Sequence, residues 1–276
     1  MNTPILVTGG TGTIGSRVVP MLRDAAQDVR ILSRHRGEDE PGIEHVEGDT
    51  VTARGLAEAL HGIDVVLHLA GGAKGDNVAA MNLATAAKDA GVRHLILISV
   101  VGADAMPIGY FRAKAQAERA IAESGVPWTV LRAAQLHEFV LPMVRGLARL
   151  PLLLTPGGLR FEPVHVEEVA ARLTEVALGS PAGRVADMTG PEVLDIRQLT
   201  NTYGEVMGAR ARRVVPVHIP GAVGRAYRAG ENLAGEDKQQ GQRTWQQFLS
   251  GLRAEVDDRE ARDRSDSLRR GRITHA

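Results

Sequence analysis

The sequence predicts a doubly wound α/β fold, in which helices cover both faces of a parallel β-sheet. Over the first 130 residues, short apolar runs alternate with longer segments of helical periodicity. Several of these runs are apolar throughout, which is typical of strands covered on both faces. A glycine-rich turn follows the first run and opens the first helical segment. A chain of 276 residues fits one large domain, or one domain with a small appended lobe.

The first half of the chain supplies the strands and crossover helices of this sheet. We expect strands at 5–8, 29–32, 43–46, 65–69, 95–99 and 128–131. We expect helices between them at 15–26, 53–61, 77–90 and 110–124. Together these elements form a nucleotide-binding core over residues 1–134, with right-handed crossovers between its parallel strands.

In the second half of the chain, the alternation of strand-like and helical segments is interrupted by proline and glycine. Helices are expected at 136–149, 166–178, 196–207 and 244–252, and short strands near 184–188 and 213–217. We interpret residues 135–252 as a substrate-binding lobe, interleaved with the core and placed over the carboxyl edge of the sheet, where open α/β folds bind ligands. The segment 253–276 holds thirteen charges of mixed sign, which leaves a frayed helix or a disordered tail, with disorder the stronger expectation.

The composition excludes several classes of protein. Thirty-three basic residues balance thirty-three acidic ones, so no overall field favours nucleic acid or an anionic membrane, and aromatic residues make up only 3%. The absence of cysteine rules out disulfides and thiolate catalysis, and the nine histidines have no metal-binding spacing, so no metal is expected. No apolar run reaches the about 18 residues that cross a bilayer. We expect a soluble, cytoplasmic monomer or homodimer.

The strongest motif is the run VTGGTGTIG at 7–15, between the first strand and the first helix. Its glycines match both common dinucleotide spacings, and its place after a strand and before a helix is the context that supports them. One glycine permits a tight turn, another lets the backbone approach a pyrophosphate, and the last lets helix and strand pack closely. The alternative is a turn that is merely rich in glycine. The expected phosphate-binding residues are Gly9, Gly12, Thr13, Ile14 and Gly15.

The end of the second strand predicts which dinucleotide binds. An NAD site usually places a carboxylate there for the ribose hydroxyls, but this chain has Ser33 and Arg34. A guanidinium can bind a 2′-phosphate with two parallel hydrogen bonds. We therefore expect NADP(H) to be preferred over NAD(H). Alternatively, Arg34 and Arg36 are ordinary solvated charges.

Other strand ends complete the expected cofactor site. The Asp49 carboxylate, in the run Gly48, Asp49 and Thr50, could accept the adenine amino group, and it could equally cap the helix expected at 53–61. Small residues at the next strand ends would let the cofactor lie against the sheet edge. The cofactor-binding residues expected there are Leu69 with its small neighbours Ala70 and Gly71 and, after the sixth strand, Ala133.

Taken together, these runs resemble the short-chain dehydrogenase/reductase superfamily, and within it the NmrA-like branch of NAD(P)H-binding proteins. The resemblance covers residues 4–180 well and the remainder loosely. The glycine loop is shared across the superfamily, and the later runs point to the branch. The runs are TGGTGTIG at 8–15, GD at 48–49, AGVRH at 90–94, YFRAK at 110–114, WTVLRA at 128–133 and PVHVEEVA at 163–170.

The resemblance implies a catalytic pair. Reductases of the superfamily carry Tyr-x-x-x-Lys on a helix beside the nicotinamide, and Tyr110 and Lys114 match it. Four residues apart on a helix, the ammonium would lie near the phenol and lower the tyrosine pKa towards neutrality. The same lysine would hold the nicotinamide ribose. The alternative is a surface aromatic beside a solvated lysine.

One departure from the family pattern concerns the catalytic serine or threonine. The family places it just beyond the first serine at the end of the fifth strand, whereas here Ser99 is followed by Val100 and Val101. Ser99 either contacts cofactor or substrate, or merely ends its strand. Further along, Gln135 or His137 could touch substrate, although a lone histidine is more often structural.

These observations predict an NADPH-dependent oxidoreductase acting on a hydrophobic carbonyl, enone or quinone. The substrate would lie under the segments 136–149 and 159–166. The alternative function is a regulatory protein that senses NADP(H) without turnover; the missing second serine favours it, and the intact tyrosine–lysine pair opposes it.

Overall fold

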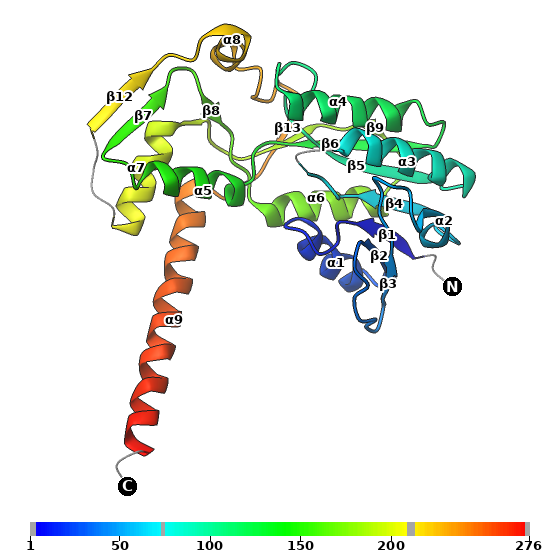
Figure 1. Ribbon diagram of the computed structural model, residues 1–276, viewed down its shortest axis with the longest axis horizontal. Helices are drawn as coiled ribbons and strands as arrows, with labels where there is room; N and C mark the ends of the chain where they lie inside the picture. Colours follow the sequence, from blue (N-terminus) through cyan, green and yellow to red (C-terminus); the bar gives the residue numbers. More distant parts are fainter. Residues whose placement is uncertain (1–3, 73–74, 209–212, 274–276) are drawn as a thin grey trace.

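The computed structural model describes residues 4–72, 75–208 and 213–273 (Figure 1). Its centre is a parallel sheet whose first six strands run in the spatial order β3-β2-β1-β4-β5-β6. This is the order of a dinucleotide-binding α/β fold, so the doubly wound prediction is confirmed. The strands are β1 (Ile5–Thr8), β2 (Val29–Ser33), β3 (Ile43–Glu47), β4 (Val65–His68), β5 (His94–Val100) and β6 (Trp128–Ala133).

The helices of the core cover both faces of this sheet (Figure 1). On one face, α1 (Gly15–Asp24) packs against α6 (Val166–Leu178) over buried side chains such as Val18 and Leu173. On the other face lie α2 (Leu56–Ala59), α3 (Asp76–Asp89) and α4 (Gly109–Ala122), over a second buried cluster. The carboxyl ends of the strands thus remain as the open edge of the core.

The helix expected at 53–61 is much shorter in the structure. Helix α2 spans Leu56–Ala59, because Ala53 and Gly55 have positive φ angles of 62° and 76°, which no right-handed helix accepts. The segment before it is a turn in which Asp49 N donates to Arg54 O at 2.9 Å.

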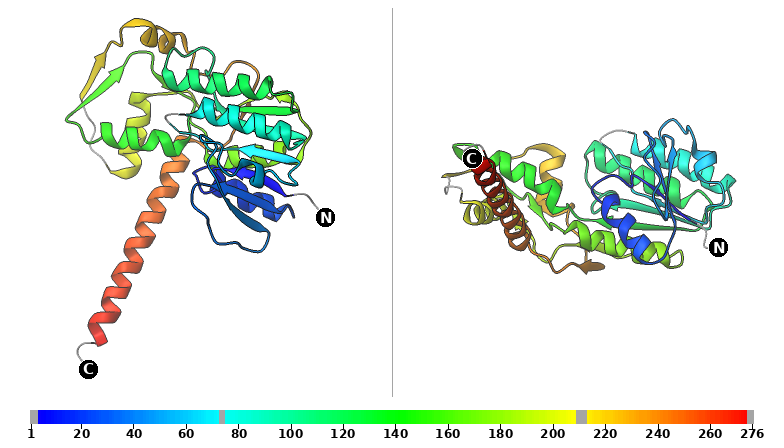
Figure 2. Two further views of the ribbon diagram at one scale, coloured as in Figure 1. Left: turned by 45° about the vertical axis from the view of Figure 1, so that its right-hand side comes forward. Right: turned by 90° about the horizontal axis from the view of Figure 1, so that it is seen from below.

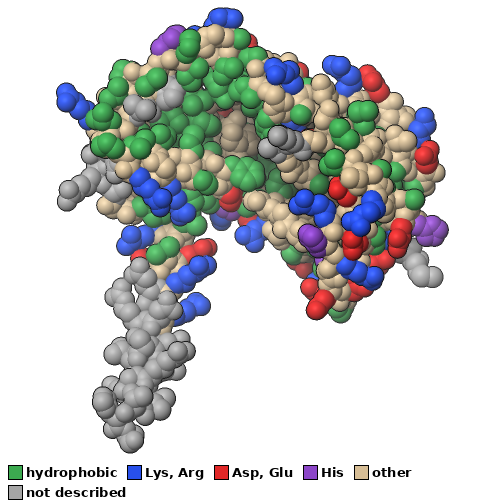
Figure 3. Space-filling view, in the orientation of Figure 1, with side chains coloured by type: hydrophobic (Ala, Val, Ile, Leu, Met, Phe, Trp, Pro, Cys, Tyr) green, Lys and Arg blue, Asp and Glu red, His purple; other side chains and the backbone are tan. Residues whose placement is uncertain are grey.

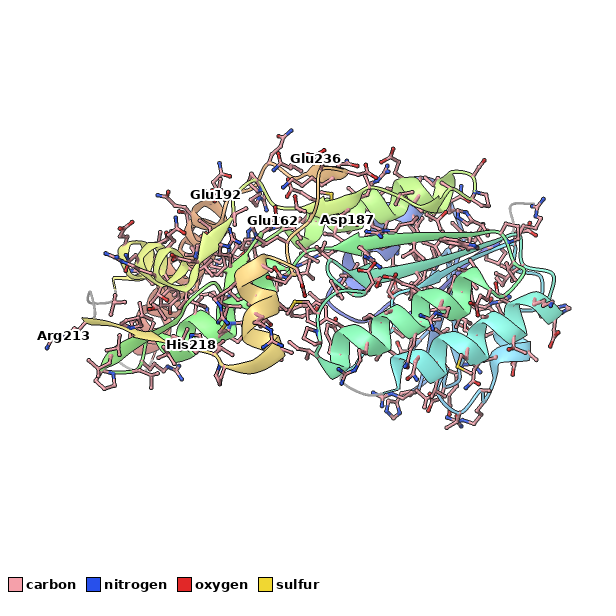
Figure 4. All side chains as sticks on the ribbon, turned by 90° about the horizontal axis from the view of Figure 1, so that it is seen from above. Glu162, Asp187, Glu192, Arg213, His218 and Glu236 are labelled. Atoms are coloured by element: carbon pink, nitrogen blue, oxygen red, sulfur yellow. The ribbon has the colours of Figure 1, made fainter. Side chains whose placement is uncertain are left out.

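The second half of the chain builds a lobe beside the core. Helices α5 (His137–Leu147), α7 (Ile196–Met207) and the first turns of α9 (Trp245–Ile273) enclose Val140, Leu199 and Trp245. Strand β7 (Leu152–Pro156) pairs in parallel with β12 (Arg213–Val217), and β8 (Arg160–Phe161) pairs with β11 (Leu194–Asp195). Seen from above, Glu162 and Asp187 lie between the core and the lobe, and Arg213 lies at the far end of the lobe (Figure 4).

Two strands from the second half return to the core sheet. Strand β10 (Asp187–Thr189) pairs with β6, and β13 (Lys238–Gln240) pairs with β10, both in parallel. The strand expected at 184–188 is therefore split, with β9 (Gly183–Arg184) pairing separately with β6. Buried Glu162 joins the two parts, since it accepts from Lys238 Nζ and from Ala234 N, both at 2.7 Å.

Several elements of the lobe were not predicted. Strands β8, β11 and β13 have two or three residues, too few for a periodic pattern, and β7 lies in an apolar run that suggests core as readily as strand. Helix α8 (Gly221–Ala229) follows Pro220 and contains glycine at two of its nine positions, a composition that favours a turn.

Helix α9 continues well beyond the body of the protein (Figure 2). It remains helical through residues 253–273, so of our two alternatives for this segment the structure has the helix and not the disordered tail. Its arginine, alanine and glutamate residues are good helix formers, and Arg253 pairs with Asp257 one turn later at 3.0 Å. No helix within the described ranges is long and apolar enough to cross a membrane.

Candidate functional site

The glycine loop between β1 and α1 forms the centre of the site. Gly9 has φ +72°, and a Cβ there would lie 2.6 Å from Ala70 N. A Cβ on Gly15 would overlap the carbonyl oxygen of Gly9. On Gly12, by contrast, a Cβ would meet just the Gly9 oxygen, at 3.2 Å. Gly9 and Gly15 are therefore required by the fold, whereas Gly12 keeps open the exposed side of the loop.

The same loop presents unpaired backbone donors. The amides of Thr11, Thr13 and Ile14 donate to no described residue. Helix α1 begins at Gly15; its N-cap residue, Ile14, provides no side-chain cap, and its first turn has no acidic residue. Its positive end is thus free to receive an anion, and these residues fit a dinucleotide pyrophosphate.

A buried hydrogen-bonded chain fixes the adjacent strand ends. Thr8 Oγ1 lies 2.6 Å from His68 Nδ1 and accepts from Ala70 N at 3.2 Å. Burial lowers the pKa of His68 to about 4, so the imidazole is neutral and its Nδ1 can accept from the Thr8 hydroxyl. These bonds hold Leu69, Ala70 and Gly71 beside the glycine loop. No sequence motif indicates this hydrogen bond between residues 60 positions apart.

The residues expected around the adenosine half lie along the same edge. Ser33 donates its hydroxyl hydrogen to the carbonyl oxygen of His35. Arg34 is exposed and forms no ion pair with any described residue, whereas Arg36 lies 3.7 Å from Asp39. Asp49 Oδ1 accepts from Val51 N at 2.8 Å, so this carboxylate shapes its own turn. Gly48 packs closely, since a Cβ there would lie 2.7 Å from Arg54 O.

Tyr110 and Lys114, the predicted catalytic pair, do not interact as expected, because the lysine pairs with a carboxylate instead. Lys114 is buried, and its Nζ lies 2.8 Å from Oδ2 of buried Asp76. Tyr110 is 41% exposed and contacts the edge of Phe111, with ring centroids 5.6 Å apart. Burial and the Asp76 charge raise the pKa of Tyr110 to about 12. This direction is opposite to the lowering that we expected from Lys114, whose ammonium is paired with Asp76 instead.

Ser99 belongs to a buried ion-pair network behind the edge. Its hydroxyl donates to Glu118, which binds Arg132 through two bonds of 2.7 and 2.8 Å. Arg132 also donates to Asp104 at 2.9 Å. The Ser99 hydroxyl is therefore bound to Glu118 of α4, and Ser99 lies one residue before the end of β5. The hydroxyl hydrogen of Ser99 is therefore not available to a substrate. No sequence motif indicates that Glu118 would accept this hydrogen bond.

The two residues expected to contact substrate, Gln135 and His137, have different surroundings in the structure. His137 is completely buried, stacks on Phe248 at 4.9 Å between centroids, and lies 5.6 Å from the Trp245 ring. Burial lowers the pKa of His137 to about 3, and a substrate contact by this residue is wrong because its side chain belongs to the lobe core. Gln135 is half-buried and remains a candidate, and Ala133 is buried beneath the edge as expected.

An exposed aromatic residue was overlooked by the sequence reasoning. Phe139, in the first turn of α5, is 62% exposed. It follows the sixth strand within a turn of Gln135, at the carboxyl edge of the sheet. Figure 3 shows the molecule hollowed between the core and the lobe, with hydrophobic side chains in the recess. Another hollow, which Pro4, Asp28 and Ile43 help to line, lies at the opposite, amino ends of the strands.

Comparison with known sequences agrees with this geometry. The model of an NAD(P)H-binding family matches residues 9–142. A (4-alkanoyl-5-oxo-2,5-dihydrofuran-3-yl)methyl phosphate reductase of Streptomyces griseus is 31% identical over 75% of each chain. An NAD(P)H azoreductase of Xenophilus azovorans is 28% identical over 76% of each chain, and quinone oxidoreductase 2 of Escherichia coli is 26% identical over 71% of each.

Solved structures share the fold. An NADPH-dependent quinone oxidoreductase from Escherichia coli, complexed with NADPH, has a TM-score of 0.73 and 20% identity, covering 90% of this chain and 99% of its own. A triphenylmethane reductase from Citrobacter has a TM-score of 0.71 and 23% identity, covering 85% and 92%. At these identities the likeness concerns the architecture.

Proposed function

The chain belongs to the NAD(P)H-binding family and is an NAD(P)H-dependent oxidoreductase, and we propose that it reduces hydrophobic conjugated acceptors such as enones and quinones. The observation that carries the cofactor part of this proposal is the open loop at Gly12, where unpaired amides meet the positive end of α1. When bound, a reduced nicotinamide dinucleotide supplies hydride. The chain's residues bind its phosphates, position the acceptor and stabilise the charge that develops on it.

We assign the binding roles along the carboxyl edge of the sheet. The amides of Thr13 and Ile14 would bind the pyrophosphate, and the region around Asp49 would bind adenine. Small residues at the ends of β4 and β6, among them Ala70 and Ala133, leave room for the nicotinamide half. Each of these assignments rests on the exposed or closely packed backbone described above.

The acceptor site is proposed beside Phe139 and Tyr110. Both are exposed, and both follow strands that end at the same edge, since α4 follows β5 and α5 follows β6. An exposed aromatic face suits a flat conjugated ring. The names of the three relatives specify a dihydrofuran derivative, azo compounds and a quinone as acceptors, which supports this substrate class.

The function is tested by oxidation of NADPH by the purified protein with a panel of quinones and enones. We expect turnover, and we expect Tyr110→Phe to lower kcat/KM by about tenfold, the effect of losing one hydrogen bond of about 1.4 kcal/mol in the transition state. The Kd for NADPH, measured by fluorescence, should not change. Tight NADPH binding without turnover of any acceptor would favour the sensing protein instead.

We further propose that NADPH is preferred over NADH, because Arg34 is an exposed guanidinium without an ion-pair partner in the described chain. Arg34→Ala should raise the Kd for NADPH by about 10- to 100-fold, as expected for a lost charge-assisted contact of about 1.5–3 kcal/mol, and leave the Kd for NADH unchanged. Arg36→Ala serves as the control, since Arg36 already faces Asp39. Equal weakening of both cofactors would contradict the preference.

A further inference from the structure

The ion pair between Lys114 and Asp76 is an unusual feature to find beside a cofactor site. Both residues are 6% exposed, and Nζ and Oδ2 are 2.8 Å apart. Burying two charges is expensive unless each is compensated by the other and by further hydrogen bonds. Asp76 has such a bond, because its Oδ1 accepts from Gly72 N at 2.7 Å.

The pair joins three elements at the nicotinamide end of the edge. Asp76 is the first residue of α3, Lys114 lies on α4, and Gly72 follows β4. Gly71 provides the space for the ammonium, since a Cβ there would lie 3.2 Å from Lys114 Nζ. The lysine side chain is thereby enclosed, and its positive charge is compensated by the Asp76 carboxylate.

The Tyr110 phenol lies one helical turn before Lys114 on α4. The charged group that acts on this phenol is Asp76 from α3. Asp76 in turn pairs with Lys114, and both of these charges act on the neutral imidazole of His68 from β4. No hydrogen bond or ion pair joins the phenol to the lysine within the described residues. Asp76 is the charge that acts on the phenol, and a negative charge disfavours phenolate.

We propose that Asp76 is a positioning residue that holds Lys114 in a buried ion pair and so keeps Tyr110 a hydrogen-bond donor rather than a base. This inference rests on the proposed function and adds a direction to it. In the reduction, a hydride with both its electrons reaches a carbon of the acceptor, and a C=O π pair moves onto oxygen. The phenol O–H donates a hydrogen bond to that oxygen, and water supplies the proton.

The reverse reaction needs a group that removes the hydroxyl proton as hydride leaves. A phenolate stabilised by a free ammonium could do this, but here the ammonium is neutralised by Asp76. The geometry therefore favours a reductase that works poorly as an alcohol dehydrogenase. The acceptors that suit it are those whose reduced oxygen needs little help from an enzymic acid, as in a hydroquinone.

The test is a spectrophotometric titration of tyrosine, which needs neither cofactor nor substrate. The difference between the titration curves of the wild type and Tyr110→Phe isolates Tyr110 from Tyr203 and Tyr227. We expect a midpoint near 12 in the wild type, lowered by at least about one pH unit in Asp76→Asn. Asp76→Glu, which keeps the charge, should restore it. Asp187→Asn, at another buried carboxylate that pairs with Arg184 at 3.3 Å, should not change it (Figure 4).

Turnover gives a second readout. As the pH rises, Asp76→Asn should lose reductase rate at a lower pH than the wild type, because its phenol ionises earlier, and this difference should vanish in the Tyr110→Phe background. An ordinary wild-type midpoint near 10, or an unchanged midpoint in Asp76→Asn, would overturn the inference; the first measurement needs no Asp76 variant to fold. A shifted midpoint in a protein that reduces none of the acceptors would instead overturn the proposed function.

Discussion

Gly12→Val should raise the Kd for NADPH by about 100-fold or more, equivalent to about 2.7 kcal/mol, while the protein keeps its fold. The added isopropyl group would occupy the exposed side of the loop, where the pyrophosphate backbone contacts are proposed. Within the protein, a Cβ on Gly12 meets just the Gly9 oxygen at 3.2 Å, so a small adjustment of the loop accommodates it. Isothermal titration with NADPH and thermal unfolding separate the two effects.

Two other glycines provide the controls for this substitution. Gly15→Val should lower the Tm and the yield of folded protein, since its Cβ would overlap the Gly9 carbonyl oxygen. Gly146→Val lies on α5 with no atom near its Cβ, and it should leave both NADPH binding and folding unchanged. Tight NADPH binding by Gly12→Val would contradict the assignment of the loop.

Glu118→Ala should lower the free energy of unfolding by about 3 kcal/mol, because it leaves a buried arginine without its main partner. Arg132 and Glu118 are joined by two hydrogen bonds, and their side chains are 5% and 14% exposed. Asp104 remains as a partner, but its side chain is 60% exposed and holds Arg132 through one bond. Urea denaturation measures the loss.

The matched control for that variant is Glu175→Ala. Glu175 also pairs with an arginine, Arg172, at 2.7 Å, but the Glu175 side chain is 66% exposed. An ion pair whose carboxylate is exposed to water contributes about 0–1 kcal/mol, so the unfolding midpoint should hardly move. Equal losses for the two variants would show that burial of the Arg132 network has no special role.

The core was predictable because its signals are local. Strand β1 and the start of α1 follow from a short apolar run and the glycines after it, and the structure has both at the expected residues. The different duties of Gly12 and Gly15 were also implied by the motif. The lobe was predicted in part, since α7 and β12 occupy the expected residues 196–207 and 213–217. Its other strands were not predicted, because they are short and pair with residues far along the chain, as β7 does with β12.

The catalytic pair shows where sequence reasoning stops. Helical spacing correctly placed Lys114 one turn from Tyr110, but spacing cannot reveal that a carboxylate 38 residues earlier would take the ammonium. An acidic residue in the first turn of a helix, such as Asp76, is ordinarily explained by its favourable interaction with the helix dipole. The prediction of a substrate contact for His137 was wrong for a similar reason. Its burial depends on Phe248, which lies more than a hundred residues later in the chain.

The return of β10 and β13 to the central sheet has a consequence for dissecting the molecule. Met188 pairs with Ala133, and the amide of Ala134 donates to the Met188 oxygen at 2.8 Å. A fragment ending at residue 134 would leave one side of β6 bare, and bare strand edges recruit other chains into aggregates. The two halves of this polypeptide are thus mutually dependent, and shortened versions are poor reagents for measuring nucleotide affinity.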